Sequence, residues 1–244
     1  MSELIQNRIL VWDLPTRWFH WLLAASFAGA WLTSESERYS ALHVMLGYTL
    51  LGLIAFRLVW GLAGTRYARF KDFAYSPARV VQYVKSLVAG KPEHYLGHNP
   101  AGALAVFLLL GLGIATGVSG WLTYNEIGGE WLEEAHELFA NAMLVVVGVH
   151  IAGVVVSSFL HRENLARAMV TGYKQGGPDG SINKKRGIAA LLLIAAVAGF
   201  WGLWFNGKLD SLVSGQASAQ TEDGGGHRDE EDRRGRKDRH DDDD

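Results

Sequence analysis

Four of the nine histidines occupy positions where an ionisable side chain is costly unless it serves a function. His20 and His150 fall inside long apolar runs, whereas His43 and His136 stand at or beside the outer ends of such runs. At a helix rise of ~1.5 Å per residue, His20 and His150 each lie about 20 Å below the same membrane surface. His43 and His136 both lie close to that surface, so the four histidines form two level pairs.

One helix supplies a histidine to each pair. His136 and His150 are fourteen residues apart, which corresponds to about 21 Å of helix and returns to within about 40° of the same face. Each has a partner at matching height on another helix. Facing imidazoles from separate helices suit a six-coordinate haem iron, whose flat macrocycle fits between helices. We therefore interpret the pairs His20/His150 and His43/His136 as axial ligands of two haem irons.

Histidines in these positions can also bind zinc, relay protons or form structural hydrogen bonds. A zinc site needs three or four ligands at one point, which a vertical separation of about 20 Å excludes for this set. A proton relay through His20 and His150 stays open, although no membrane carboxylate accompanies them. A structural hydrogen-bonding role also stays open for each histidine taken alone. His161 shares a face with His150 and is a competitor for the deeper site.

The elements that must position these histidines are long apolar helices. The chain has 244 residues, of which 49% are hydrophobic, and its apolar runs show hardly any polar face. A bilayer core of about 30 Å needs roughly 20 apolar residues of helix. The sequence therefore predicts an all-α fold, a transmembrane four-helix bundle with an additional C-terminal transmembrane helix. The expected spans are about 18–33, 42–62, 101–122 and 138–160, with the fifth at 188–206.

The predicted domain is the bundle of residues 1–175. Residues 176–187 contain Gly-Gly-Pro-Asp-Gly, which is typical of a flexible linker, and residues 207–244 are expected to form a charged disordered tail. Between the second and third spans, Ser76 to Val88 predicts a short amphipathic surface helix. Its first turn holds a proline, and Arg79 and Lys85 are free to meet lipid phosphates.

Loop charges predict the orientation of the bundle. The segments on the N-terminal side of the membrane carry 15 Lys and Arg residues, against Arg38 alone in the two opposite loops. The positive-inside rule then places the N-terminus in the cytoplasm, and a fifth span places the C-terminus in the periplasm.

Composition excludes several kinds of protein. The stretch 222–244 holds 11 acidic and 6 basic residues, so the remaining part of the chain has a small net positive charge. This charge is not strong enough to indicate nucleic-acid binding, and none is expected. The absence of cysteine excludes disulfides, thiolate iron–sulfur clusters, cysteine nucleophiles and covalent attachment of c-type haem.

Two arginines and five glycines are candidates for contact with a haem. Arg57, near the inner end of the second span, can pair with a haem propionate or serve as a snorkelling surface anchor. Arg17 has the same two interpretations. Glycines on the ligand helices let a porphyrin approach the backbone, or allow close helix packing; they are Gly29, Gly47, Gly52, Gly148 and Gly153.

Several motifs resemble one known family. They are the run Trp-Asp-Leu-Pro-Thr-Arg-Trp-Phe-His-Trp ending at Trp21, Leu-His-Val-Met-Leu-Gly-Tyr ending at Tyr48 with Arg-Leu-Val-Trp-Gly beyond it, Tyr95 to Pro100, and the helix bearing His136 and His150. Together they are similar to the bacterial cytochrome b561 and nickel-iron hydrogenase b-type cytochrome superfamily, over roughly residues 8–175. The resemblance implies a four-helix core with two non-covalent b-type haems, His20 and His150 on the inner one and His43 and His136 on the outer one. The fifth span and the tail depart from the family's pattern.

Family membership also implies a function in the bacterial inner membrane. The leading hypothesis is electron transfer between the quinone pool and a periplasmic redox partner such as a c-type cytochrome. A second hypothesis is a quinone-linked oxidoreductase whose outer haem oxidises superoxide. A third is a membrane anchor and electron-transfer subunit of a hydrogenase-like complex. No side chain is assigned a catalytic role, and the acidic tail either steers a basic partner or is a solvated extension.

Overall fold

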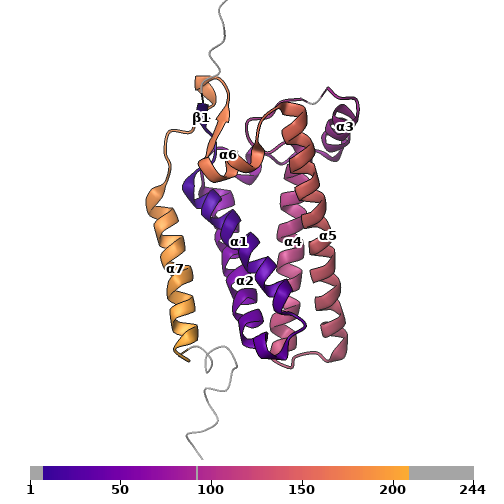
Figure 1. Cartoon of the computed structure of the whole chain (residues 1–244), viewed down its shortest axis with the longest axis vertical. Coiled ribbons are helices and arrows are strands. Elements are labelled where there is room, and N and C mark those ends of the chain that lie inside the picture. The colour runs from indigo at the N-terminus through magenta and orange to yellow at the C-terminus, as the bar shows by residue number, and fades with distance from the viewer. Residues whose placement is uncertain (1–7, 92, 209–244) are drawn as a thin grey trace, which may run out of the picture.

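The computed structural model describes residues 8–91 and 93–208. Five helices run side by side along the long axis of the molecule (Figure 1). They are α1 (Leu14–Thr33), α2 (Ser40–Ala63), α4 (Pro100–Tyr124), α5 (Glu130–His161) and α7 (Gly187–Phe205). The remaining elements are β1 (Arg8–Leu10), η1 (Glu37–Tyr39), η2 (Phe70–Asp72), α3 (Pro77–Val88), α6 (Leu165–Thr171), β2 (Tyr173–Gln175) and η3 (Pro178–Gly180).

The long helices form two antiparallel hairpins. Helix α1 packs along α2 and α4 packs along α5, while α2 and α4 join the hairpins and α7 lies against α1 and α2. Buried apolar side chains from α1, α2, α4, α5 and α7 form one core; they are Phe19, Phe27, Leu50, Leu53, Ile54, Leu110, Met143 and Leu193. The predicted all-α membrane bundle is confirmed.

Four helical segments in the described residues are long and apolar enough to cross a membrane: Glu37–Ala63, Pro100–Tyr124, Glu130–His161 and Gly187–Phe205. They contain four of the five predicted spans. The predicted span 18–33 lies in α1, which has 20 residues but does not reach the same apolarity because it also carries Arg17, His20 and Ser26. Helix α5 begins at Glu130, before the apolar run, so His136 lies within the helix.

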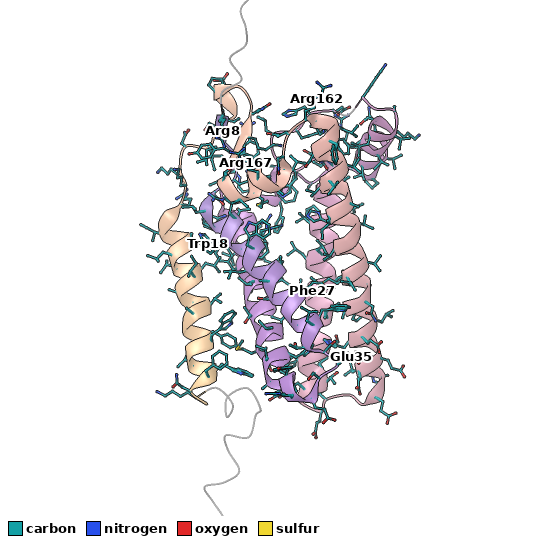
Figure 2. The ribbon with its side chains drawn as sticks, in the orientation of Figure 1. Arg8, Trp18, Phe27, Glu35, Arg162 and Arg167 are labelled. Carbon is teal, nitrogen blue, oxygen red and sulfur yellow. The ribbon has the colours of Figure 1, made fainter. Side chains whose placement is uncertain are left out.

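Charged side chains divide the bundle into two ends (Figure 2). Arg8, Arg162 and Arg167 gather at the end that carries β1, α6 and α3, and we call it the basic end. Glu35 lies at the opposite end, which we call the acidic end. The turn between α1 and α2 and the turn between α4 and α5 both lie at the acidic end.

A small β-sheet at the basic end was not predicted. Strands β1 and β2 pair antiparallel, with Ile9 opposite Lys174. The predicted linker 176–187 contains η3 and is held against the bundle, because Ile182 N donates to the Leu10 carbonyl oxygen at 2.8 Å and Tyr67 Oη donates to the Gly180 carbonyl oxygen at 2.7 Å. Three-residue strands carry too little alternation to be recognised in a sequence. The predicted tail lies outside the described residues from position 209 onward.

The surface helix α3 forms nearly where the sequence predicts it. Ser76 caps its first turn by accepting from Arg79 N, and Pro77 occupies the first helical position. The expectation that Arg79 is free to meet lipid phosphates is wrong. Its Nη2 forms an ion pair with Glu93 Oε2 at 2.7 Å, and its Nη1 donates to Gln82 Oε1 at 3.0 Å.

Asp13 fixes the start of α1 to the end of α2. Its carboxylate is almost fully buried, and Oδ1 accepts from Thr16 N at 2.9 Å as the N-terminal cap of α1. Its Oδ2 accepts from Trp60 Nε1 at 3.1 Å and from Thr65 Oγ1 at 2.8 Å. One carboxylate therefore satisfies three donors that the bundle would otherwise leave without partners.

We expect Asp13→Ala to destabilise the protein by about 3 kcal/mol. It removes a helix cap and leaves two partly buried donors, Trp60 Nε1 and Thr65 Oγ1, without an acceptor. The thermal unfolding midpoint of the detergent-solubilised protein measures the effect. Asp72→Ala is the control, since the partly exposed Arg69–Asp72 ion pair contributes about 0–1 kcal/mol. Equal losses in the two variants would contradict the role of Asp13.

Candidate functional site

His43 and His136 face each other near the acidic end of the bundle. His43 lies in the first turn of α2 and His136 in the second turn of α5. Their ring centroids are 6.1 Å apart, and the ring planes are inclined at 80°. The structure therefore brings this predicted pair together from two different helices.

The other two helices of the hairpins hold these imidazoles in place. His43 Nδ1 lies 2.8 Å from the Ala30 carbonyl oxygen on α1, and His136 Nδ1 lies 2.9 Å from the Thr116 carbonyl oxygen on α4. A carbonyl oxygen only accepts, so each Nδ1 carries the proton and donates. The Nε2 atom of each imidazole is therefore the nitrogen left to bind a metal ion.

Gly120 of α4 makes room for His136. A Cβ atom at position 120 would lie 2.7 Å from His136 Cε1 and 2.9 Å from Nδ1, closer than side chains approach one another. Ser119, one residue earlier, places its Oγ 3.3 Å from His136 Nδ1. Gly120 could not be predicted as a site residue, because nothing in the local sequence of α4 indicates that a histidine packs against it.

His20 and His150 form a second site toward the basic end. They come from α1 and α5, and the two imidazoles lie within electrostatic range of each other. His20 Nδ1 is buried and has no hydrogen-bond partner among the described residues. His20 therefore lacks the carbonyl acceptor that fixes each imidazole of the first pair.

Arg57 is buried near the basic end of α2. Only 3% of it is exposed, its guanidinium lies 4.7 Å from the ring centroid of Phe70 and 5.8 Å from that of Phe73, and its Nη1 is buried without a hydrogen-bond partner. Such burial does not match a snorkelling surface anchor. Arg17 donates from Nη2 to the Val170 carbonyl oxygen, while its Nε is buried without a partner.

His98 packs against Phe73, as Arg57 does, although its position in the sequence did not indicate a site residue. Its ring lies 4.8 Å from the indole ring of Trp12 and 4.3 Å from the ring of Phe73, measured between centroids. Its Nδ1 is buried without a hydrogen-bond partner. Burial is the main cause that lowers the pKa of His98 to about 3, with smaller contributions from Arg57 and His150, so its imidazole is neutral.

His161, the competitor for the deeper site, lies in a different cluster. Its ring centroid is 5.6 Å from that of His94. His94 and the largely buried Lys174 both approach Glu163 Oε2, at 3.8 Å and 3.4 Å. His161 thus lies in a separate cluster at the end of α5, whereas the charge of His150 acts on His20. The structure therefore favours His20 over His161 as the neighbour of His150.

The five glycines divide into two groups. A Cβ atom at Gly29 would lie 2.7 Å from Leu46 Cδ1, so Gly29 allows α1 and α2 to pack closely. A Cβ atom at Gly47, Gly52, Gly148 or Gly153 would meet nothing within 4 Å. Gly52 lines an apolar groove between α2 and α7, so it does not face α5. An approach of a porphyrin to Gly47, Gly148 and Gly153 stays a prediction.

The arrangement of donors indicates what the site can bind. In the part of the chain that the structure describes, no three His, Asp or Glu side chains form a group able to hold a metal ion. The imidazoles come in twos, which leaves an iron's four equatorial positions to a macrocycle. The ligand-bearing helices α1 and α5, and likewise α2 and α5, are not among the closely packed helix pairs. This chemistry fits a haem held between helices.

Comparison with known proteins identifies the family. A model of the family described as prokaryotic cytochrome b561 matches residues 11–172. This chain belongs to the prokaryotic cytochrome b561 family. Consistent with that assignment, all four predicted ligand histidines, Arg17, Arg57 and His98 lie within the matched residues.

Curated relatives carry one description. Three are called "Probable Ni/Fe-hydrogenase B-type cytochrome subunit", from Rhodobacter capsulatus, Rhizobium leguminosarum bv. viciae and Azotobacter vinelandii. They are 22%, 24% and 26% identical to this chain, over 70%, 68% and 71% of its length and 84%, 89% and 91% of theirs. No solved structure matches. The cytochrome b561 protein described here is thus a bacterial membrane b-type cytochrome of electron transfer.

We expect Gly120→Ala to reduce the haem bound per chain, because the added methyl group displaces His136 from its position against α4. The quantity of haem per chain, measured from the reduced pyridine adduct of the purified protein, checks this result. Gly111→Ala lies on the same helix, where an added Cβ meets nothing within 4 Å, and it should retain parental haem. Equal haem contents in the two variants would show that Gly120 does not position a ligand.

Proposed function

We propose that this cytochrome b561 protein binds two b-type haems and transfers electrons across the membrane between the quinone pool and a redox partner on the periplasmic side. His43 and His136 ligate the outer haem, and His20 and His150 ligate the inner one. The proposal adds to the family assignment the number of haems, their ligands and the two ends of the electron path.

The geometry of His43 and His136 is the observation that carries the proposal. An imidazole nitrogen binds a transition metal at about 2 Å, so two imidazoles on opposite faces of one iron hold their ring centroids about 6 Å apart. The observed separation is 6.1 Å. Both Nδ1 atoms already donate to carbonyl oxygens, which leaves both Nε2 atoms for the metal.

Helix α5 supports the second haem. It carries His136 and His150 about 21 Å apart along its axis, so a single helix contributes a ligand at both depths. At the deeper level the partner is His20, and the unpartnered Arg57 Nη1 is a suitable donor to a haem propionate. Arg17, in the first turn of α1, contributes a second guanidinium whose Nε is buried without a hydrogen-bond partner.

A bound haem b supplies a reversible one-electron couple at its iron, and the chain determines how that couple is held. The two imidazoles of each pair would hold the iron and would keep water and small ligands from binding it. The chain's buried helices keep the site apolar, while Arg57 adds a fixed positive charge that favours reduction. The two sites lie one above the other on α5, which gives electrons a path through the membrane.

The orientation rests on charge. Arginines gather at the basic end and Glu35 lies at the acidic end (Figure 2). The positive-inside rule places the basic end and the N-terminus in the cytoplasm, and α7 then places the C-terminus in the periplasm. The pair His43/His136 lies near the acidic end and is therefore the one closer to a periplasmic partner. That partner is a c-type cytochrome or another oxidoreductase subunit.

A second candidate function is favoured by the relatives. Their printed descriptions name a hydrogenase B-type cytochrome subunit, so this chain is alternatively the membrane anchor of a hydrogenase-like complex. The same haem pairs serve both functions, and only the outer partner differs. Purification of the tagged protein from its native membranes distinguishes the two, since the anchor function requires a large periplasmic subunit to co-purify.

We expect the purified protein to contain two haems per chain, and each of His20→Ala, His43→Ala, His136→Ala and His150→Ala to lose one of them. The reduced spectrum and the haem content of each variant provide the measurement. Variants of the same pair should lose the same spectral component, and variants of different pairs should lose different components. His161→Ala is the control and should keep both haems.

Two outcomes would overturn this assignment. One haem per chain in the parent protein excludes the two-haem proposal. Two haems that persist in His150→Ala exclude the pairing, because that variant removes the ligand on α5. Reduction of both haems by a quinol in reconstituted membranes is the matching test of the quinone substrate, and its absence would exclude the proposed electron path.

A further inference from the structure

Three side chains toward the basic end, Arg57, His98 and His20, come from separate segments of the chain and have buried polar atoms without hydrogen-bond partners among the described residues. We call them the unpartnered cluster. We propose that His98 and Arg57 together bind the carboxylate groups of the inner haem, with His98 as a positioning residue that raises the reduction potential of that haem. The proposal rests on the two-haem function proposed above and assigns a role to His98 for the first time.

Two aromatic rings hold the His98 side chain. Trp12 precedes α1, and its indole ring packs edge-on against His98 at 4.8 Å between centroids. Phe73 follows η2, and its ring lies 4.3 Å from His98 on the same measure. The backbone is fixed as well, because Tyr75 Oη donates to the His98 carbonyl oxygen at 3.1 Å and Asn99 caps α4. A side chain held in this way is suited to present one ring nitrogen in a fixed direction.

Phe73 also brings His98 and Arg57 to the same place. The Arg57 guanidinium lies 5.8 Å from the Phe73 ring centroid and 4.7 Å from that of Phe70. His98 and Arg57 thus pack against one phenylalanine ring. Arg57, His150 and His20 also contribute to lowering the pKa of His98, which is consistent with their lying in one region of the bundle.

In the unpartnered cluster, Arg57 Nη1, His98 Nδ1 and His20 Nδ1 are each buried without a hydrogen bond among the described residues. The ion pairs found among residues 8–91 and 93–208 do not include Arg57. Asp13 is the acidic residue whose charge acts on Arg57. Both of its carboxylate oxygens already accept hydrogen bonds, from Thr16, Trp60 and Thr65.

A buried guanidinium without an anion is unfavourable, so a negatively charged group would stabilise the unpartnered cluster. A carboxylate is the complementary group, because its two oxygens accept from Arg57 Nη1 and from a neutral imidazole N–H at the same time. Haem b carries two such groups on one edge of its macrocycle. The donors of Arg57 and His98 would fit those groups on a haem held by His20 and His150.

The experiment uses the full-length, haem-loaded protein in detergent. His98→Leu removes the donor, His98→Asn keeps a donor near the position of Nδ1, and Arg57→Gln removes the positive charge. His94→Ala is the matched control, since it removes another histidine of the same loop whose side chain is about half exposed. Each protein is measured for haem per chain, for the spin state of its ferric haems and for the midpoint potentials of both haems in a redox titration.

We expect His98→Leu to retain two low-spin haems and to lower the midpoint potential of one, the haem that is missing from His150→Ala. Loss of a donor leaves the carboxylate charge less compensated and disfavours the added electron, by up to about tenfold in the reduction equilibrium, or ~59 mV for one electron. Arg57→Gln should lower the same potential further. His98→Asn should stay close to the parent, and His94→Ala should match it.

Several results would overturn the inference. If His98→Leu keeps both haems and both potentials, His98 is only a packing residue, and the two-haem function is unaffected. If one haem is lost or becomes high-spin in both His98 variants, His98 is an axial ligand instead. If His98→Leu does not fold, His98→Gln replaces it, and equal potentials in the Asn and Gln variants would then contradict a donor at Nδ1.

Discussion

An imidazole inside an apolar helical bundle has two nitrogens to satisfy and no water with which to satisfy them. Carrying a proton on both is costly there, so the ring stays neutral, with one donor and one acceptor nitrogen. At the acidic end, carbonyl oxygens of Ala30 and Thr116 take the donor of each ring. The remaining lone pair needs an electrophile, and a metal ion held between two such rings meets that need.

This constraint explains why four helices are needed to build one site. Helices α2 and α5 contribute the imidazoles, whereas α1 and α4 contribute the carbonyl acceptors that orient them. Gly120 is the point where α4 comes close enough to do so. Each ring and its acceptor lie within one hairpin, so a shift of one hairpin against the other would separate the two rings from each other. The packing of the hairpins and the geometry of the site are therefore one property of the fold. Asp13 contributes to the same end by tying α1 to α2.

The two ends of the bundle solve different electrostatic problems. Near the acidic end, the imidazoles of His43 and His136 each have a backbone carbonyl oxygen as acceptor. Toward the basic end, Arg57, His98 and His20 keep buried polar atoms without partners. Buried polar groups without partners are rare in native proteins, and a cluster of them marks a place where a ligand supplies the missing interactions. The β1–β2 sheet lies at the same end of the bundle.

The sequence by itself determined the apolar helices, the levels of the four histidines and the resemblance to the cytochrome b561 family, because each follows from composition or from spacing along a helix of known rise. It also identified Arg57, but not its burial. Only the tertiary structure decided that His98 and Arg57 pack against the same ring of Phe73, that Gly120 admits His136 and that residues 173–175 pair with the N-terminal strand. These contacts join segments far apart in the chain, and they depend on how helices pack rather than on the periodicity of any one helix.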